Sequence, residues 1–248
     1  MAERPLRLQA AVLTHEGRVR EVNEDSVLAR PQDGLWAVAD GMGGHAHGRR
    51  AAGLVTAALE AAPPSTDFPA ATQAVAEALR AANAAIFAEA QALGGQMGST
   101  AAALLVCGEQ FAVLWVGDSR VYQLRDGRLV QLTTDHSQVQ EMVTAGRLTP
   151  EEAERHPMAH VLSRAVGVQP QLAVEAVTGA ARAGDIFLIC SDGLIRTLRD
   201  AELETLLGDG PPQAVAERLV SLCLERGAPD NVSVVVVACD EPPLAGRG

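Results

Sequence analysis

The chain has 248 residues, of which 48% are hydrophobic, and carries a formal net charge of −11. This length and apolar content suffice for one sizeable domain with a hydrophobic core, which excludes a disordered or fibrous protein. The sequence contains no lysine, which excludes a P-loop Gly-Lys-Ser/Thr motif, a Schiff-base lysine and a lysine general base. Its basic residues are arginines scattered from Arg4 to Arg247, so we expect no basic face for nucleic acid.

The sequence also bears on the cellular compartment. The first residues include charged side chains but no apolar segment typical of a signal peptide, and the longest apolar runs are far shorter than the roughly 20 residues that span a bilayer. The four cysteines are widely spaced and form no Cys-x-x-Cys pair, as expected of reduced, buried thiols. We therefore predict a cytoplasmic protein that does not bind membranes.

Strands and helices are predicted in blocks along the chain. Apolar runs predict strands at 35–39, 111–116, 186–190 and 232–239, and Asp126-Gly127 marks a hairpin within 121–132. Helical spacing covers 50–62 and 69–92, and further helices are expected to begin at Thr149-Pro150, Asp200 and Pro211-Pro212. This order predicts two largely antiparallel sheets with helices outside them. One domain is expected over residues 1–240, followed by a short flexible tail over 241–248.

Aspartates recur where predicted strands end. Asp40, Asp118 and Asp192 each follow an apolar run and sit in a glycine-containing turn, whereas Asp230 directly precedes the last run. If that strand is antiparallel to the others, all four carboxylates meet at one edge. Any one of these aspartates is explained by turn geometry alone, but the repetition favours a common site.

Clustered carboxylates repel one another, and they share a site only with a cation or with raised pKa values. Glu24 and Asp25 add two more near the N-terminus. Hard oxygen ligands without a cysteine and histidine set favour Mg²⁺ or Mn²⁺ over Zn²⁺. The sequence thus predicts a Mg²⁺ or Mn²⁺ site.

An ordered series of motifs carries a family resemblance. They are residues 14–25, Asp-Gly-Met-Gly-Gly-His at 40–45, Gly-Ser-Thr at 98–100, Gly-Asp-Ser-Arg at 117–120, and the segments 132–137, 145–167, 189–194 and 230–233. In this order and spacing, over roughly residues 8–239, the chain resembles the bacterial form of the PP2C-type (PPM) metal-dependent protein serine/threonine phosphatases. The resemblance implies an α+β fold with a central antiparallel β-sandwich flanked by helix pairs.

The resemblance also implies a set of metal ligands. Asp40 would bridge two Mn²⁺ or Mg²⁺ ions, the Gly41 carbonyl would ligate one of them, and Asp192 and Asp230 would hold the other. Asp118, together with Asp192, matches the ligands of a third, weaker metal site in bacterial members.

Catalytic roles follow from the same resemblance. Glu24 would act through metal-bound water, and Arg20 would bind the substrate phosphate. Eukaryotic members have a histidine directly after Asp-Gly as the proposed general acid, but this chain has Met42 there. The nearest alternative is His45, and the other is a metal-bound water.

The implied activity is hydrolysis of phosphoserine and phosphothreonine on proteins by direct attack of a metal-bridging water, opposing a bacterial Ser/Thr kinase. Covalent cysteine phosphatases, which use a Cys-x₅-Arg loop, are not expected. Two other functions remain open: a catalytically weak regulatory module of the same family, and a metal-dependent nuclease. A net charge of −11 disfavours the nuclease, because a polyanionic substrate would be repelled.

Overall fold

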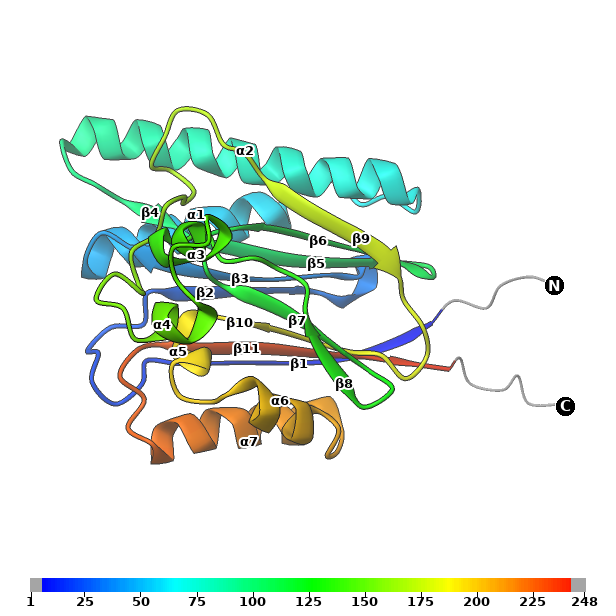
Figure 1. Ribbon diagram of the computed structural model, residues 1–248. Helices are drawn as coiled ribbons and strands as arrows, with labels where there is room; N and C mark the ends of the chain where they lie inside the picture. The colour runs from blue at the N-terminus through cyan, green and yellow to red at the C-terminus, as the bar shows by residue number, and fades with distance from the viewer. Residues whose placement is uncertain (1–5, 242–248) are drawn as a thin grey trace, which may run out of the picture.

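The structure is a computed structural model that describes residues 6–241, with only the backbone of His45 and Glu154. Two antiparallel sheets face each other in its centre (Figure 1). One sheet has the strand order β1 (Arg7–His15), β11 (Val232–Asp240), β10 (Ile186–Cys190), β7 (Arg120–Arg125) and β8 (Arg128–Gln131). The other has the order β2 (Asp25–Arg30), β3 (Leu35–Met42), β5 (Ala101–Cys107), β6 (Gln110–Val116) and β9 (Glu175–Ala180), and the short β4 (Gly98–Ser99) pairs with β3.

Helices cover the outer face of each sheet (Figure 1). α1 (His45–Glu60) and α2 (Phe68–Leu93) pack on the β2–β9 sheet, whereas α6 (Asp200–Leu207) and α7 (Pro212–Glu225) pack on the β1–β8 sheet. The shorter elements are η1 (Pro31–Asp33), α3 (Gln138–Thr144), α4 (Pro150–Glu154) and α5 (Asp192–Ile195). The predicted α+β class, an antiparallel sandwich between helix pairs, is confirmed.

The central strands are buried on both faces, which explains their continuous apolar runs. On β3, Trp36 and Val38 point between the sheets, whereas Ala37 and Ala39 pack against the helical layer. β11 repeats the pattern, since Val235 and Val237 face the other sheet and Val234 and Val236 face α6 and α7. Each sheet therefore shares one core with its partner sheet and another with its helices.

Local signals set several helix ends. Thr149 and Glu152 form the predicted capping box at the start of α4, and Asp67 caps α2 by accepting a hydrogen bond from the Ala70 amide. α1 begins at His45, five residues before the predicted start. Its N-cap, Gly44, has a φ of +84°, which favours glycine.

The tail predicted over 241–248 lies, from residue 242 onward, outside the described residues, and the proposed domain boundary stays a prediction. Among residues 6–241, no helix combines the length and apolar character that crossing a bilayer requires.

The layer between the sheets should dominate stability. Phe187 is fully buried there and packs edge-to-face on Phe111 at a ring-centroid distance of 5.0 Å. We expect Phe187→Ala to lower the free energy of unfolding by about 3–5 kcal/mol, because it removes apolar contacts and leaves a cavity. The measurement is equilibrium urea unfolding. Val130→Ala, at a 44% exposed position, is the control and should change it by less than about 0.5 kcal/mol. A Phe187→Ala loss as small as the control's would contradict a shared core.

Candidate metal centre

The topology brings five carboxylates to one edge of the sandwich. β3 and β6 both pair antiparallel with β5, so Asp40 in β3 and Asp118 after β6 lie at the same edge. β10 and β11 are antiparallel, so Asp192 after β10 meets Asp230 before β11. Asp25, the first residue of β2, is the register partner of Asp40.

Burial and neighbouring negative charge raise the pKa of Asp25, Asp40, Asp118 and Asp192. Burial, followed by the charges of Asp25 and Asp192, raises the pKa of Asp40 well above its ordinary value. Burial raises the pKa of Asp25 to about 7, and burial together with Asp192 raises that of Asp118 to about 7. Desolvation and like charge both disfavour the ionised forms, so the cluster holds more potential negative charge than it can carry without a cation.

Two arginines contact the cluster. Arg20 Nη2 lies 2.9 Å from Asp230 Oδ2. Arg196 Nη2 lies 2.5 Å from Asp192 Oδ2, and its Nη1 lies 3.2 Å from Asp230 Oδ2. In the part of the chain that the structure describes, no three Asp, Glu, His or Cys side chains are gathered closely enough to hold an ion. These two guanidinium groups place positive charge directly against Asp192 and Asp230.

Asn231 fixes the loop that carries Arg20 and Glu24. Its Nδ2 donates to the Glu16 and Val22 carbonyls at 2.9 and 3.0 Å, and its Oδ1 accepts from the Glu24 amide at 2.8 Å. One side chain beside Asp230 thus holds both ends of residues 16–24. In the sequence, Asn231 stands out only as part of the motif at 230–233.

Two glycines allow this loop, β3 and α1 to approach closely. A Cβ on Gly41 would lie 2.0 Å from the Gly48 carbonyl oxygen, and one on Gly48 would lie 2.4 Å from Glu24 Oε1. The Gly41 amide donates to the Glu24 carbonyl at 3.2 Å. Glycine at both positions is what lets Glu24 lie beside the segment that follows Asp40.

Asp25 also connects the two sheets. Its Oδ2 accepts hydrogen bonds from the hydroxyls of Ser191 (2.8 Å) and Ser233 (2.7 Å). Its Oδ1 is buried and has no hydrogen-bond partner among the described residues. Carboxylate oxygens are the donors that hard divalent cations such as Mn²⁺ and Mg²⁺ prefer, and the unsatisfied buried Oδ1 of Asp25 is an oxygen of this chemical kind.

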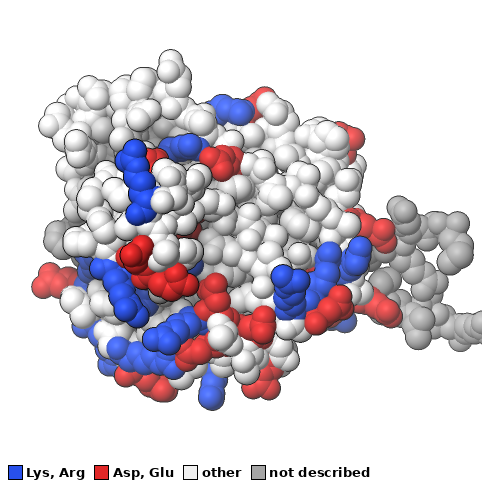
Figure 2. Space-filling view, viewed as in Figure 1, with Lys and Arg blue, Asp and Glu red and all other residues white. Residues whose placement is uncertain are grey.

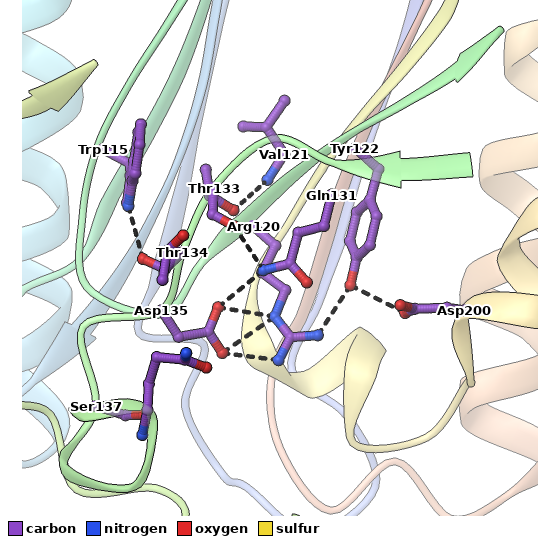
Figure 3. Close-up of polar contacts among 11 residues, drawn as sticks. Trp115, Arg120, Val121, Tyr122, Gln131, Thr133, Thr134, Asp135, Ser137 and Asp200 are labelled. Carbon is purple, nitrogen blue, oxygen red and sulfur yellow. Dashed lines mark hydrogen bonds and ion pairs between the residues drawn. The ribbon is translucent and has the colours of Figure 1, made fainter. Parts of the chain in front are cut away.

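A polar network follows the Asp118 turn in the sequence, and Figure 3 shows its members Arg120, Tyr122 and Asp135 facing one another. Arg120 forms a forked ion pair with Asp135, with Nε–Oδ1 at 2.9 Å and Nη2–Oδ2 at 2.7 Å, and donates to the Tyr122 hydroxyl. The neighbouring His136 is tied to Gly117 by two hydrogen bonds, because its amide donates to the Gly117 carbonyl and its Nδ1 accepts from the Gly117 amide. Buried, satisfied networks of this kind rigidify the turns that they support.

His45 begins α1, but its side chain lies outside the described part of the structure. Its expected role as general acid therefore stays a prediction.

The exclusion of covalent cysteine phosphatases cannot rest on sequence spacing, since Cys190 and Arg196 do have the Cys-x₅-Arg spacing. The structure supplies a different reason. Cys190 is fully buried in the core beneath α6 and α7, and burial raises the pKa of its thiol. A nucleophilic cysteine needs an accessible thiolate, so Cys190 does not have the character of a nucleophile.

Comparison with known proteins decides the family. The sequence profile of the protein phosphatase 2C family matches residues 14–226. The chain belongs to the protein phosphatase 2C family. The expectation from the sequence motifs is thereby confirmed.

Curated relatives of this family include the serine/threonine protein phosphatase PstP of Mycobacterium tuberculosis, 43% identical over 245 residues, and the protein phosphatase PhpP of Streptococcus pneumoniae, 31% identical over 243 residues. These alignments cover 95% and 94% of this chain, and 46% and 98% of the respective relatives. The chain thus spans about half the length of PstP.

Solved structures of the family are also similar. PppA of Pseudomonas aeruginosa has a TM-score of 0.87 at 42% identity, with 94% of this chain and 97% of that one covered. The catalytic domain of PstP, solved in complex with two manganese ions, has a TM-score of 0.84 at 40% identity, with 95% and 100% covered.

The raised pKa of Asp25 predicts a pH dependence for the metal-free protein. The folded-state pKa of Asp25 (about 7) lies above the unfolded value of about 3.9, so stability falls as pH rises between these two values. Above about pH 7 Asp25 is ionised in both states and the loss is complete. Asp25→Asn cannot ionise, so its stability relative to the wild type should rise by on the order of 1.4 kcal/mol per pH unit between pH 5 and pH 7, and level off above pH 7. Urea unfolding in EDTA at several pH values measures this. A difference that is flat, or that falls with pH, would contradict the buried-carboxylate account.

Proposed function

We propose that the chain hydrolyses phosphoserine and phosphothreonine on proteins in a metal-dependent reaction. The observation that carries the proposal is the group of buried, mutually repelling carboxylates, with Asp40 in the midst of Asp25, Asp118, Asp192 and Asp230. Membership of the protein phosphatase 2C family supports the same reaction class, as does the protein phosphatase activity by which PstP and PhpP are named.

Asp40 and the Gly41 carbonyl, with Asp192 and Asp230, would hold two Mn²⁺ or Mg²⁺ ions, and Asp118 with Asp192 would hold a third, weaker one. The two manganese ions in the PstP structure support the first pair. Bound divalent cations would activate water for attack and neutralise charge on the phosphoryl group.

Arg20 is proposed to bind the substrate phosphate. Its side chain is 49% exposed while one terminal nitrogen contacts Asp230, so it stands between the carboxylates and solvent. A guanidinium fork in this place can orient phosphoryl oxygens by charge-assisted hydrogen bonds.

Glu24 and His45 are proposed to handle water and protons. Asn231 and Gly41 hold the backbone of Glu24, which fixes the point from which its side chain extends. His45, at the start of α1, is proposed to donate the proton to the departing serine or threonine oxygen.

The nuclease alternative is not favoured. Figure 2 shows acidic and basic side chains interleaved over the lower part of one face, with no continuous basic track there. The net charge of −11 adds repulsion for a polyanion. Phosphorylated proteins are therefore the proposed substrates, while the Ser/Thr kinase partner and the cytoplasmic location remain predictions.

Metal removal tests the function. Hydrolysis of a phosphothreonine peptide should be lost in EDTA and restored by Mn²⁺, because the carboxylates alone repel a phosphate dianion. Asp40→Asn should abolish most of the Mn²⁺-restored turnover. Asp126→Asn is the matched control, since Asp126 occupies the hairpin turn with a φ of +52° that asparagine also tolerates, and it should retain full turnover. Full activity after exhaustive metal removal would refute the proposal, and metal binding without turnover would favour the regulatory module.

A further inference from the structure

Arg196 occupies an unusual place among the carboxylates. It directly follows α5, one helical turn after Asp192, and its amide donates to the Asp192 carbonyl at 2.9 Å. Its guanidinium spans two carboxylates, with Nη2 at 2.5 Å from Asp192 Oδ2 and Nη1 at 3.2 Å from Asp230 Oδ2. One side chain therefore bridges the two aspartates that are proposed to share a divalent cation.

The surroundings hold Arg196 in this place. Gly193, in the same turn, packs so closely on Asn231 that a Cβ would lie 1.9 Å from the Asn231 carbonyl oxygen. Thr197 fastens the end of the turn, because its hydroxyl donates to the Gly193 carbonyl at 3.1 Å. The backbone that carries Arg196 is thus fixed against the site, and the guanidinium can leave the carboxylates only by side-chain rotation.

Burial makes the contact strong. The side chains of Asp192 and Asp230 are 10% and 15% exposed, and that of Arg196 is 25% exposed, so water screens the pair less than at a surface. Arg20 contacts Asp230 alone, from a side chain that is 49% exposed. Of these two arginines, Arg196 is the one placed between the carboxylates.

We propose that Arg196 is a built-in competitor of the divalent cation: its guanidinium takes the cation's place between Asp192 and Asp230 in the metal-free protein and must swing out before the metal binds. This inference rests on the metal site of the proposed function. Arg196 would thus set the metal affinity of the site and keep Asp192 and Asp230 paired when no metal is bound.

The competition lowers the metal affinity of the site and raises the stability of the metal-free protein. The apparent dissociation constant of the metal rises by the inverse of the fraction of molecules in which Arg196 has swung out, so a one-tenth fraction corresponds to about a tenfold weaker affinity. In the metal-free protein, removal of Arg196 leaves two buried carboxylates without this partner and lowers stability. A substitution at this position should therefore tighten metal binding and destabilise the metal-free fold.

The test uses Arg196→Gln and Arg196→Met, which keep the length of the stem, in the full chain. Titration calorimetry with Mn²⁺ should give a dissociation constant about tenfold lower than that of the wild type. Thermal unfolding in EDTA should give a lower Tm. Arg226→Gln is the matched control, because Arg226 pairs with Glu202 and the Thr197 carbonyl and is not paired with Asp192 or Asp230, so its Mn²⁺ affinity should equal that of the wild type.

A measurement on the wild type keeps the test independent of variant folding. The guanidinium protons of Arg196 should exchange slowly with solvent in EDTA and quickly with saturating Mg²⁺, as followed by ¹⁵N NMR. Slow exchange in both states, or an unchanged or weaker Mn²⁺ affinity in folded Arg196 variants, would overturn the inference while the proposed function stands. A wild-type protein that binds no Mn²⁺ would instead overturn the proposed function and this inference with it.

Discussion

Mutual repulsion among the carboxylates at one edge of the sandwich is the constraint on which this molecule's chemistry depends. Asp40 experiences burial and the charges of Asp25, Asp192, Asp118 and Asp230 together. Each of these groups would ionise fully in water, and each has a raised pKa or an arginine partner here. The clustered carboxylates are therefore stabilised by any positive charge placed among them. Arg196 would supply that charge in the metal-free protein, and the proposed metal ions would supply it when bound.

The fold holds these carboxylates in fixed positions. Three packed cores, one between the sheets and one under each helical layer, position the ends of β3, β6 and β10 and the start of β11. Hydrogen bonds then connect the layers at the site: Asp25 accepts from Ser191 and Ser233, and Thr100 accepts from the Asp40 amide at 2.9 Å. Because backbone and side chains are fixed together, the carboxylates cannot relax apart to relieve their repulsion.

The sequence predicts best what burial dictates. β3, β6, β10 and β11 are buried on both faces, so their apolar runs are continuous and easily recognised. β9 alternates partly buried and exposed residues and contains Gly179, which leaves no such run. β1 has exposed positions interspersed along its length, and no strand was predicted there.

Some of the site residues could be predicted from the sequence and others could not. The recurring aspartates could be predicted because each follows or precedes a core strand. The roles of Asn231 and Arg196 depend on contacts with residues 16–24 and with Asp230, and no local pattern encodes those contacts. The Cys190–Arg196 spacing shows the converse, since a motif is present there whose cysteine is buried in the core.

The most direct test of the carboxylate account is anomalous diffraction at the manganese edge from crystals of the protein grown with Mn²⁺. We predict two strong anomalous peaks within ligand distance, about 2.0–2.3 Å, of carboxylate oxygens from Asp40, Asp192 and Asp230 and of the Gly41 carbonyl. Anomalous peaks confined to other parts of the surface, with these carboxylates still bound only to arginine at saturating Mn²⁺, would contradict it.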